Sequence, residues 1–551
     1  YLNILLDMTG GLMNLTAAGN ENIVIHGNPK KTFFKAVFKK HTNFGLQRFR
    51  IDFEGNRVLN FTTPTILDFK IPRYAELLYD TYVCVTLPDI YSPLLYKGEN
   101  ELGRNLIPYE FRWIDELGTN MIQEVEIYTG GTTLAKYSGE YLSCVKERDF
   151  TGAKKDLWNR MTGNVPEIND PANANGNINV YPNAMYIDES GVEPSIRSRK
   201  IYIPLDAFFC ESSKMALPLV ALQYQEVSIR LTFRPTYQLY TINNIADIQN
   251  DTCISYRIAP NPNDLDNQLW RFLQAPQDVA ASQELYNQSR NDWNSDVHLI
   301  GTYVFLGQEE RRTMAQNSHT ILLKQVKEYD FLGQAGSKIV EMESRDLLSG
   351  YMFRFRRSDA LMRNEWSNYT NWAYRNVQPQ ALSEDLPLLD GNEIPNPNNF
   401  HITGSIGTYA HNQKEILSEI GIIMGGVYRE KVLDSGIFNY IEKYMRSTGG
   451  AKDGLYMYQF GLNSNKKEYQ PSGAMNVNRF AEVSLEYNTV EPPFNPMGAL
   501  VEYICDASSN PIGFRKNTGS LNSYNYDMKV FEERYNVLVI KSGRAGLMMS
   551  V

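Results

Sequence analysis

The chain has 551 residues, of which 42% are hydrophobic and 12% aromatic, and its formal net charge at pH 7 is −9. This length exceeds a single β-sandwich, which runs to roughly 200–250 residues, and suggests two sandwich-sized domains with insertions. The acidic balance argues against direct nucleic-acid binding, because phosphate recognition needs a basic face.

The residue types narrow the class further. The 35 tyrosines, 38 glycines and 25 prolines favour strands joined by turns over helix bundles. Five widely spaced cysteines without a Cys-x-x-Cys pair favour buried reduced thiols over a disulfide framework or a zinc site. No apolar run reaches the roughly 18 residues of a membrane span. Leu2–Leu6 is too short for a signal-peptide core, so no secretory leader is expected.

Residues 1–25 form a polar N-terminal arm, and a basic aromatic segment follows it. Phe33, Phe34 and Phe38 share one face at helical spacing, with lysines opposite. One interpretation is an amphipathic segment that touches a membrane or an acidic partner. The favoured alternative is a short helix or strand whose aromatic side chains pack into its own domain while the lysines reach solvent.

The rest of the first half predicts short strands around one helical excursion. Strands are expected at 67–71, 82–85, 124–128, 201–205 and 217–233, with a hairpin turn at 129–132. Val227–Phe233 is the clearest of these, because its odd positions are apolar and its even positions polar. Helix is expected over 137–162, and the Asn- and Pro-rich residues 163–196 predict a long surface loop.

The second half repeats the strand-rich pattern. Polar residues 236–297 predict a linker with an insertion that contains the domain boundary, and the strand at 302–306 is expected to open the second domain. Residues 364–413 predict another insertion, and a short helix is expected near 438–444. The chain closes with a strand at 535–540.

One stretch of the second half, residues 456–487, predicts two strands joined by a corner. Alternating runs at 456–460 and 483–487 predict two half-buried strands. Between them, Pro471 fixes φ and Gly473 tolerates positive φ, so the intervening Pro-Ser-Gly predicts a tight corner.

Five strings along the chain resemble the major capsid proteins of the nucleocytoplasmic large DNA viruses. Three of them are Leu-Pro-Leu with Ala-Leu-Gln-Tyr at 217–224, Glu-Glu-Arg-Arg at 309–312, and the terminal strand with its Gly-containing tail at 535–547. The other two strings are carried by Asn28, Pro29, Phe33, Phe34, Thr42, Asn43 and Phe44, and by Gln470, Pro471, Ser472, Gly473, Asn476 and Arg479.

The resemblance implies an all-β fold of two tandem eight-stranded antiparallel jelly rolls, with long loop insertions and a few short helices. The expected parts are an arm at 1–25, a first jelly roll at 26–235, a linker or insertion at 236–297 and a second jelly roll at 298–551. It also implies a structural capsid protein whose pseudo-hexagonal homotrimers tile an icosahedral shell. Neighbouring capsomers, minor capsid proteins and an internal viral membrane are the implied partners, in the virion, after assembly in the host cytoplasm.

Signals of catalysis are weak. None of the six histidines forms a helical zinc pair, and no Gly-x-Ser-x-Gly elbow or P-loop occurs. The adjacent carboxylates Glu309/Glu310 and Glu532/Glu533 are interpreted as solvated charges, since a glycosidase needs two carboxylates facing across a cleft. No catalytic residue, metal ligand or cofactor is therefore expected.

Two alternatives remain open on the sequence. A glycan- or receptor-binding β-sandwich would use Trp366 and Trp372 as exposed stacking platforms, and a β-sandwich glycoside hydrolase would use facing carboxylates. Asn287 and Asn368 lie in Asn-x-Ser/Thr sequons within predicted surface insertions, and they are the candidate glycosylation sites.

Overall fold

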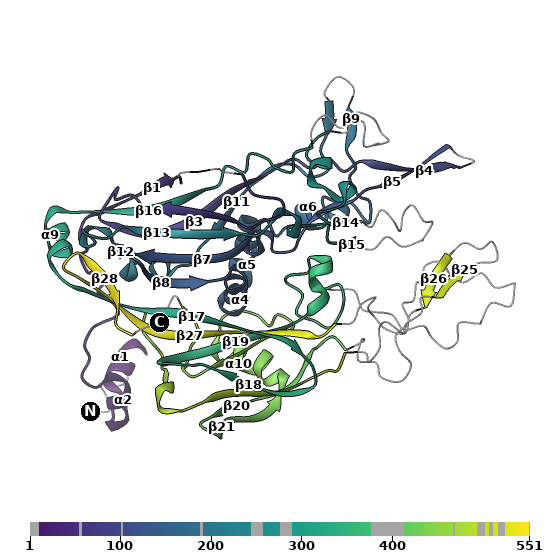
Figure 1. The fold of residues 1–551 in the computed structure, drawn as a ribbon. Helices are drawn as coiled ribbons and strands as arrows, with labels where there is room; N and C mark the ends of the chain where they lie inside the picture. The colour runs from purple at the N-terminus through teal and green to yellow at the C-terminus, as the bar shows by residue number, and fades with distance from the viewer. Residues whose placement is uncertain are drawn as a thin grey trace. The chain divides into compact units, whose positions relative to one another are not determined.

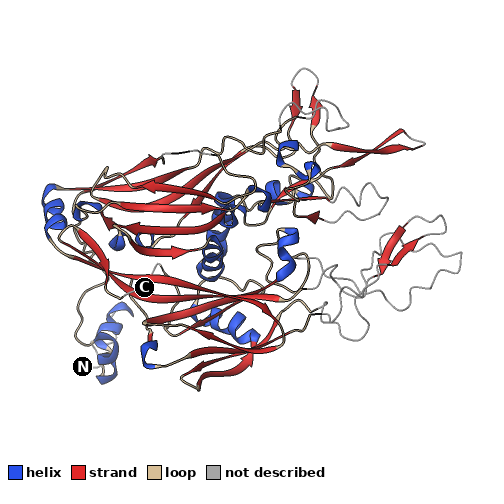
Figure 2. Cartoon of the chain, in the orientation of Figure 1, coloured by secondary structure: helices blue, strands red, loops and turns tan. Residues whose placement is uncertain are grey.

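The computed structural model describes residues 10–53, 55, 58–100, 103–187, 191–243, 257–275, 289–375, 413–466, 469–492, 502–505, 511–515 and 524–549. The chain forms two compact units, residues 1–44 and 45–551. Strands dominate the larger unit, with helices mostly in the connections (Figure 2).

Within its described residues, 10–44, the smaller unit holds three short helices, α1 (Gly10–Thr16), η1 (Asn20–Asn22) and α2 (Ile23–His26). Residues 29–43 form neither helix nor strand, so the short helix or strand predicted around Phe33 is wrong. The side chains of Phe33 and Phe34 are each 98% exposed in the single chain. The packing of these rings into the first jelly roll stays a prediction.

The first jelly roll is a sandwich of two antiparallel sheets (Figure 1). One sheet has the order β1 (Phe44–Ile51), β16 (His298–Leu306), β3 (Leu77–Leu87) and β11 (Arg199–Pro204). The other has the order β2 (Thr65–Lys70), β13 (Val227–Phe233), β7 (Ile122–Thr129) and β8 (Thr132–Tyr137).

The second jelly roll repeats this arrangement strand for strand. One sheet runs β17 (His319–Gln334), β27 (Tyr526–Lys541), β19 (Leu347–Arg357) and β22 (Leu455–Gln459). The other runs β18 (Ser337–Met342), β24 (Val483–Thr489), β20 (Leu417–Met424) and β21 (Val427–Asp434). If the strands of each sandwich are numbered in chain order, both have sheets ordered 1-8-3-6 and 2-7-4-5. The predicted double jelly roll is confirmed.

The boundary between the domains lies elsewhere than the sequence suggested. Strand β16, expected to open the second domain, pairs antiparallel with β3 and completes the first sandwich. Residues 236–297 are accordingly the connection between the seventh and eighth strands of the first jelly roll. The boundary follows Leu306, and helix α9 (Gln308–Gln316) leads into β17. The boundary was misplaced because a long polar connection resembles a linker between domains, although here the chain returns to the same sheet.

Local chemistry accounts for the best-predicted strands. In β13, Ile229, Leu231 and Phe233 are fully buried, which confirms the alternation. The turn between β7 and β8 has Gly130 at φ +52° and Gly131 at φ +87°, the positive values that two-residue hairpins require. The strand expected before β13 is wrong, because β12 (Leu217–Pro218) is two residues long and a 3-10 turn, η5 (Leu219–Ala221), follows it.

The long connections share one end of each sandwich. Successive strands run in opposite directions, so the connections that follow odd-numbered strands meet at one end. In the first jelly roll these connections carry α3 (Leu117–Met121), α4 (Gly139–Asp149), α5 (Gly152–Thr162), α6 (Pro166–Asn169), η2 (Pro171–Asn173), η6 (Thr236–Gln238), η7 (Leu265–Asn267) and η8 (Leu269–Arg271). They also carry the strands β4 (Leu94–Asn100), β5 (Gly103–Pro108), β6 (Phe111–Trp113), β9 (Met185–Ile187), β10 (Gly191–Glu193), β14 (Tyr240–Asn243) and β15 (Arg257–Ile258). Figure 1 shows β4–β5 and β9 projecting from the same end.

The second jelly roll follows the same rule. Its odd connections carry η10 (Ser358–Arg363), η12 (Ile437–Ile441), α10 (Glu442–Arg446), β25 (Glu502–Cys505) and β26 (Pro511–Arg515), so the helix predicted near 438–444 is present. The remaining elements are α7 (Phe208–Glu211), η4 (Ser213–Met215), β23 (Met475–Asn476), η13 (Val477–Arg479) and β28 (Arg544–Leu547).

The connection after β8 is more than the predicted surface loop. Ile168, Ala172, Ala174 and Tyr181 are all buried, so residues 163–187 contribute to the core. That core is continuous across the two jelly rolls, because its apolar side chains include Leu142 of α4, Met352 of β19 and Phe531 of β27. The two sandwiches are therefore held together as one body by burial.

Candidate functional site

Helix α4 lies between the two jelly rolls and is the centre of their interface, here called the seam (Figure 1). It begins after Ser138, whose side-chain oxygen accepts a hydrogen bond from the Tyr141 backbone N–H at 3.3 Å. Ten of its eleven residues are buried. A helix covered on all sides must find partners for its polar side chains, because an unpaired buried charge is costly.

The C-terminal end of α4 is capped by the second jelly roll. Helix ends leave backbone carbonyls without partners. The Gly449 N–H donates to the Arg148 carbonyl at 2.8 Å, and the Gly450 N–H donates to the Glu147 carbonyl at 3.1 Å. A Cβ on Gly449 would lie 2.2 Å from the Arg148 carbonyl oxygen, so only glycine fits this approach. One domain thus completes a helix of the other.

A bidentate ion pair spans the seam beside this helix. The Arg354 guanidinium of β19 donates to both Glu140 carboxylate oxygens, at 2.6 and 3.0 Å, and both side chains are buried. Burial by itself would raise the pKa of Glu140, but Arg354 and then Arg356 outweigh it and hold that pKa well below its ordinary value. The carboxylate therefore stays ionised inside the molecule.

A second pair crosses the seam at Glu533 of β27. Its carboxylate accepts a hydrogen bond from the Tyr141 hydroxyl at 2.7 Å and lies 3.0 Å from the Arg148 guanidinium. Burial would raise the pKa of Glu533, whereas Arg148 and nearby lysines lower it to about 2. Arg148 in turn donates to Asp149 at 2.8 and 2.9 Å.

The sequence placed Glu532 and Glu533 on a solvated face, and that interpretation is wrong. Both side chains are 0% exposed. As neighbours on an extended strand they point to opposite faces, with Glu533 towards α4 and Glu532 towards Tyr329 and Ser344 of the second jelly roll. Two carboxylates on opposite faces of a sheet cannot flank one glycosidic bond, so this pair offers no hydrolase site.

A third cluster surrounds Glu116, the residue before α3. Its carboxylate lies 3.2 Å from the Lys146 ammonium of α4 and 3.1 Å from that of Lys452, which belongs to the second jelly roll. Burial opposes ionisation, but Lys146, Lys452 and a hydrogen bond from Ser143 hold the pKa of Glu116 well below its ordinary value. This cluster adds a third charged contact across the seam.

Alternation alone could not reveal the seam, although a weaker signal was present. In Tyr351–Arg357 and Val530–Tyr535, charged residues lie directly beside large apolar and aromatic residues within a predicted strand pattern. A charge that is buried within such a strand needs a buried partner. The partners, Glu140 and Arg148, lie far away in the chain and could not be assigned without the fold.

The structure places the family-motif residues in two regions. Asn28, Pro29, Phe33, Phe34, Thr42, Asn43 and Phe44 lie in the unit 1–44, and all are exposed. The Gln470–Gly473 stretch belongs to a long connection between β22 and β23, so the predicted tight corner is wrong, although Gly473 does have a positive φ of 138°.

Ser472 and Asn476 of the second motif make local hydrogen bonds that stabilise the segment around them. The Ser472 side chain accepts from the Asn463 N–H at 3.1 Å and donates to the Asn463 carbonyl at 3.0 Å. Asn476 precedes η13 and accepts from the Asn478 N–H at 3.1 Å, while Arg479 lies exposed in that turn. The roles of both motifs in assembly stay predictions.

Two predicted surface features are buried instead. Trp366 is 7% exposed, donates its indole N–H to the Gln238 carbonyl at 3.0 Å and lies under the Arg234 guanidinium at 4.0 Å. It therefore offers no exposed stacking platform, and Trp372 is half-buried. Asn368 is 4% exposed and donates to the Trp372 carbonyl at 2.9 Å, which argues against its glycosylation in the folded chain. Asn287 lies outside the described residues.

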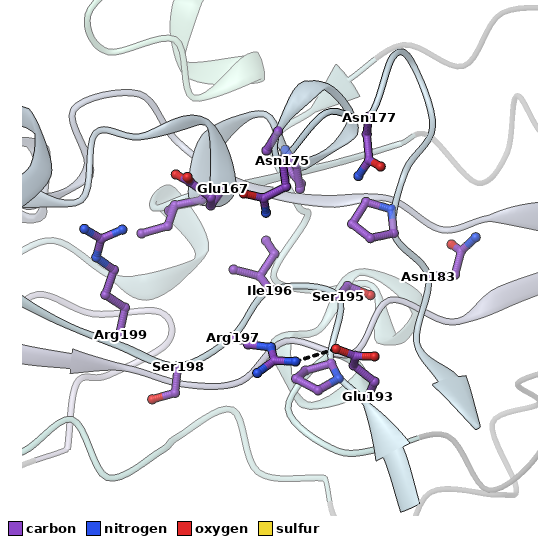
Figure 3. Close-up of a pocket in the computed structure, with 15 residues that line it drawn as sticks. Glu167, Asn175, Asn177, Asn183, Glu193, Ser195, Ile196, Arg197, Ser198 and Arg199 are labelled. Carbon is purple, nitrogen blue, oxygen red and sulfur yellow. Dashed lines mark hydrogen bonds and ion pairs between the residues drawn. The ribbon is translucent and has the colours of Figure 1, made fainter. Parts of the chain in front are cut away.

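A cavity of about 420 Å³ opens in the connection between β8 and β11 (Figure 3). Its lining combines asparagine amides, two arginines and two glutamates with an apolar base that includes Ile168 and Ile196. Ile196 is held in place by a β-bridge to Ile90. Nothing in the sequence pattern indicated this cavity.

The part of the chain that the structure describes contains no group of three or more metal-ligating side chains placed to hold an ion. Cys84, Cys144 and Cys210 are free thiols, and burial raises the pKa of Cys84 to about 11. Within the described ranges, no helix has the length and apolar character of a membrane span.

Two jelly rolls of identical strand order, fused through a buried charged seam, define a double jelly-roll protein. Residues 32–306 match the family described as "Major capsid protein N-terminus". Residues 310–546 match "Large eukaryotic DNA virus major capsid protein". The chain belongs to this family of major capsid proteins. The two matches meet where β16 ends, in agreement with the structural boundary.

Individual relatives agree with this assignment. The "Major capsid protein" of Phaeocystis pouchetii virus is 23% identical over 606 residues, covering 98% of this chain and 100% of that protein. "Capsid protein 1" of Acanthamoeba polyphaga mimivirus is 29% identical over 58% of this chain, but the match spans only 44% of that relative. The quasi-atomic structure of the PBCV-1 virus capsid shares the fold, with a TM-score of 0.58 and 18% identity over 94% of this chain and 100% of that chain.

Proposed function

We propose that this chain assembles as a pseudo-hexagonal homotrimer, and that these capsomers tile an icosahedral shell. The observation that carries the proposal is the exact repetition of strand order in the two jelly rolls. Three chains with two equivalent sandwiches each would present six similar units around one axis. The seam fixes the angle between the sandwiches of each chain, so the ring would be rigid.

The test is the mass of the purified protein in solution, measured by light scattering or sedimentation. A particle of three chains supports the proposal, and a strict monomer at micromolar concentration contradicts it. An electron-microscopy class average should show pseudo-sixfold symmetry in the trimer, whereas a three-lobed particle without six similar units would contradict the pseudo-hexagonal arrangement.

The long connections at one end of each sandwich would form the outer surface. Loop insertions cost little closure entropy, so they can lengthen without disturbing the sheets. No catalytic role is proposed, because the buried carboxylates of the seam are engaged with cations and tyrosines. Assembly would take place in the cytoplasm of the host cell, and no direct contact with nucleic acid is proposed.

The basic segment 29–43 would face the interior and contact minor capsid proteins and lipid head groups of an internal membrane. It carries five lysines and no acidic residue in an otherwise acidic chain. Its apolar side chains are exposed, with Val37 at 79% and Phe38 at 88%. Exposed aromatic groups beside cations are typical of segments that bind anionic membrane surfaces.

This contact can be tested with lipid vesicles. Neutralising Lys30, Lys31, Lys35, Lys39 and Lys40 to glutamine should abolish cosedimentation with phosphatidylserine vesicles at low salt. The control neutralises five exposed lysines elsewhere, Lys154, Lys214, Lys338, Lys431 and Lys541. Equal binding by both variants would contradict the role of the segment.

A further inference from the structure

The cavity between β8 and β11 is a built site with hydrogen-bonding groups directed into it. Figure 3 shows Asn175 and Asn177 on a loop above Ile196 and Ser195, with Glu167 and Arg199 on one side and the Arg197–Glu193 pair on another. Its volume of about 420 Å³ falls within the range of small-ligand sites.

The walls of the cavity are fixed by contacts outside it. Ser195 accepts from the Ser92 N–H at 3.0 Å, and Ser198 donates to the Leu87 carbonyl at 2.7 Å. The adjoining Ile196 is 4% exposed. The base is therefore anchored to the first sandwich and would not have to order itself when a ligand binds.

The loop above the base is held by its own hydrogen bonds. The Asn173 side chain accepts from the Asn179 N–H at 3.0 Å and donates to Asp170 at 2.9 Å. Asn175 and Gly176 have positive φ values, 54° and 88°, which turn the chain sharply at this point. The side-chain amides of Asn175 and Asn177 make no hydrogen bond within the described part of the chain, so both are available to a ligand.

The chemistry of the lining points to a neutral ligand. Two glutamates and two arginines leave the lining with no formal net charge, and the Arg197 guanidinium already pairs with Glu193 at 2.5 Å. Arg199 donates to the Arg160 carbonyl at 3.2 Å. An anion would therefore find no uncompensated cationic cluster, and a cation would find no uncompensated acidic one.

Amide side chains both donate and accept hydrogen bonds, as sugar hydroxyls do, and Pro171, Pro182 and Pro194 supply apolar surface beside them. We propose that this cavity binds a neutral sugar through Asn175 and Asn177. Binding itself does not depend on the trimer proposal. The exposure of the site on the virion does rest on the proposed outward orientation of the long connections.

The test uses the purified protein, in whatever oligomeric state it adopts, and four neutral monosaccharides, glucose, galactose, mannose and N-acetylglucosamine, with sialic acid as a charged comparison. Saturation-transfer NMR would detect binding, and titration would measure its affinity. The Asn175→Ala/Asn177→Ala double variant should weaken binding at least tenfold. The exposed Asn263→Ala control should bind as the unaltered protein does.

Loss of affinity in the double variant alone, with unchanged solution mass and melting temperature, supports the proposal. Absence of binding to all four neutral sugars overturns it, as does equal binding by the double variant or binding of sialic acid alone. Because mass and sugar binding are measured separately, a monomeric protein that still binds sugar would contradict the trimer and leave this site standing.

Discussion

The seam and the segment 29–43 depart in opposite ways from the usual distribution, in which charged side chains are exposed and apolar side chains are buried. The seam buries glutamates and arginines almost completely, whereas the segment exposes four large apolar side chains. Each arrangement is costly unless a partner compensates for it. At the seam the partners are present in the same chain, in Glu140–Arg354 and Arg148–Glu533.

The contrast indicates where binding is internal and where it must be external. Charges that are already paired inside the folded chain stabilise its geometry. Exposed aromatic side chains with no fixed secondary structure gain only when another surface covers them. We therefore expect the seam to govern the stability of the protein, and the segment 29–43 to govern the attachment of the protein to other surfaces. This contrast leads to three predictions, given in decreasing order of their expected effect on unfolding.

The largest effect is expected from breaking one buried pair. Arg354→Met should leave the Glu140 carboxylate buried without its bidentate partner, with Arg356 at 3.6 Å as its remaining cation, and lower the free energy of unfolding by about 3 kcal/mol. The double variant Glu140→Leu/Arg354→Met should recover part of that loss, because the buried carboxylate is removed together with Arg354, while Arg356, 3.6 Å from Glu140, loses its acidic partner. Denaturant unfolding followed by tyrosine and tryptophan fluorescence would measure both.

The matched control is an exposed pair in the first jelly roll. Arg230 lies 3.1 Å from Glu126 and is about 40% exposed, so Arg230→Met should cost less than about 1 kcal/mol. If Arg354→Met and Arg230→Met had equal effects, the seam would not be the stabilising element described above.

A smaller effect, dependent on pH, is expected at Glu211, the last residue of α7. Burial, opposed by Lys466 and reinforced by Asp206, raises the pKa of Glu211 to about 8. The folded chain therefore retains a proton that the unfolded chain releases near the ordinary value. Stability from this proton is complete below the ordinary value and is lost as the pH rises towards 8.

Melting temperatures measured from pH 5 to 8 would test this dependence. Glu211→Gln, which keeps the neutral shape at every pH, should flatten the decline, whereas the exposed Glu226→Gln should not. A decline of equal slope in the Glu211→Gln variant would show that another group is responsible.

The smallest effect on folding is expected in the segment. Phe33→Ser/Phe34→Ser should leave the melting temperature within about 1 °C, because these rings are exposed in the single chain. The same variant should reduce vesicle binding. A marked drop in melting temperature would mean that the rings pack within the folded protein, contrary to the contrast drawn above.

Local patterns predicted the individual helices and strands better than the way in which those strands pair in space. The strand β13 and the helices of residues 139–162 followed from periodicity, and the Gly130–Gly131 turn from glycine chemistry. The assignment of β16 to the second domain failed because pairing with β3, more than 200 residues earlier, leaves no local trace. Trp366 and Asn368 were misplaced for the same reason, since their surroundings come from distant segments.

The sequence alone determined the strand-rich architecture and the family, because alternation, turn residues and ordered motifs are properties of neighbouring residues. Only the tertiary structure decided that Glu533 is buried against Arg148, that Gly449 caps α4, and that a polar cavity forms between β8 and β11. Each of these features joins groups far apart in the chain. Their energies come from burial and pairing in space, which a one-dimensional pattern does not contain.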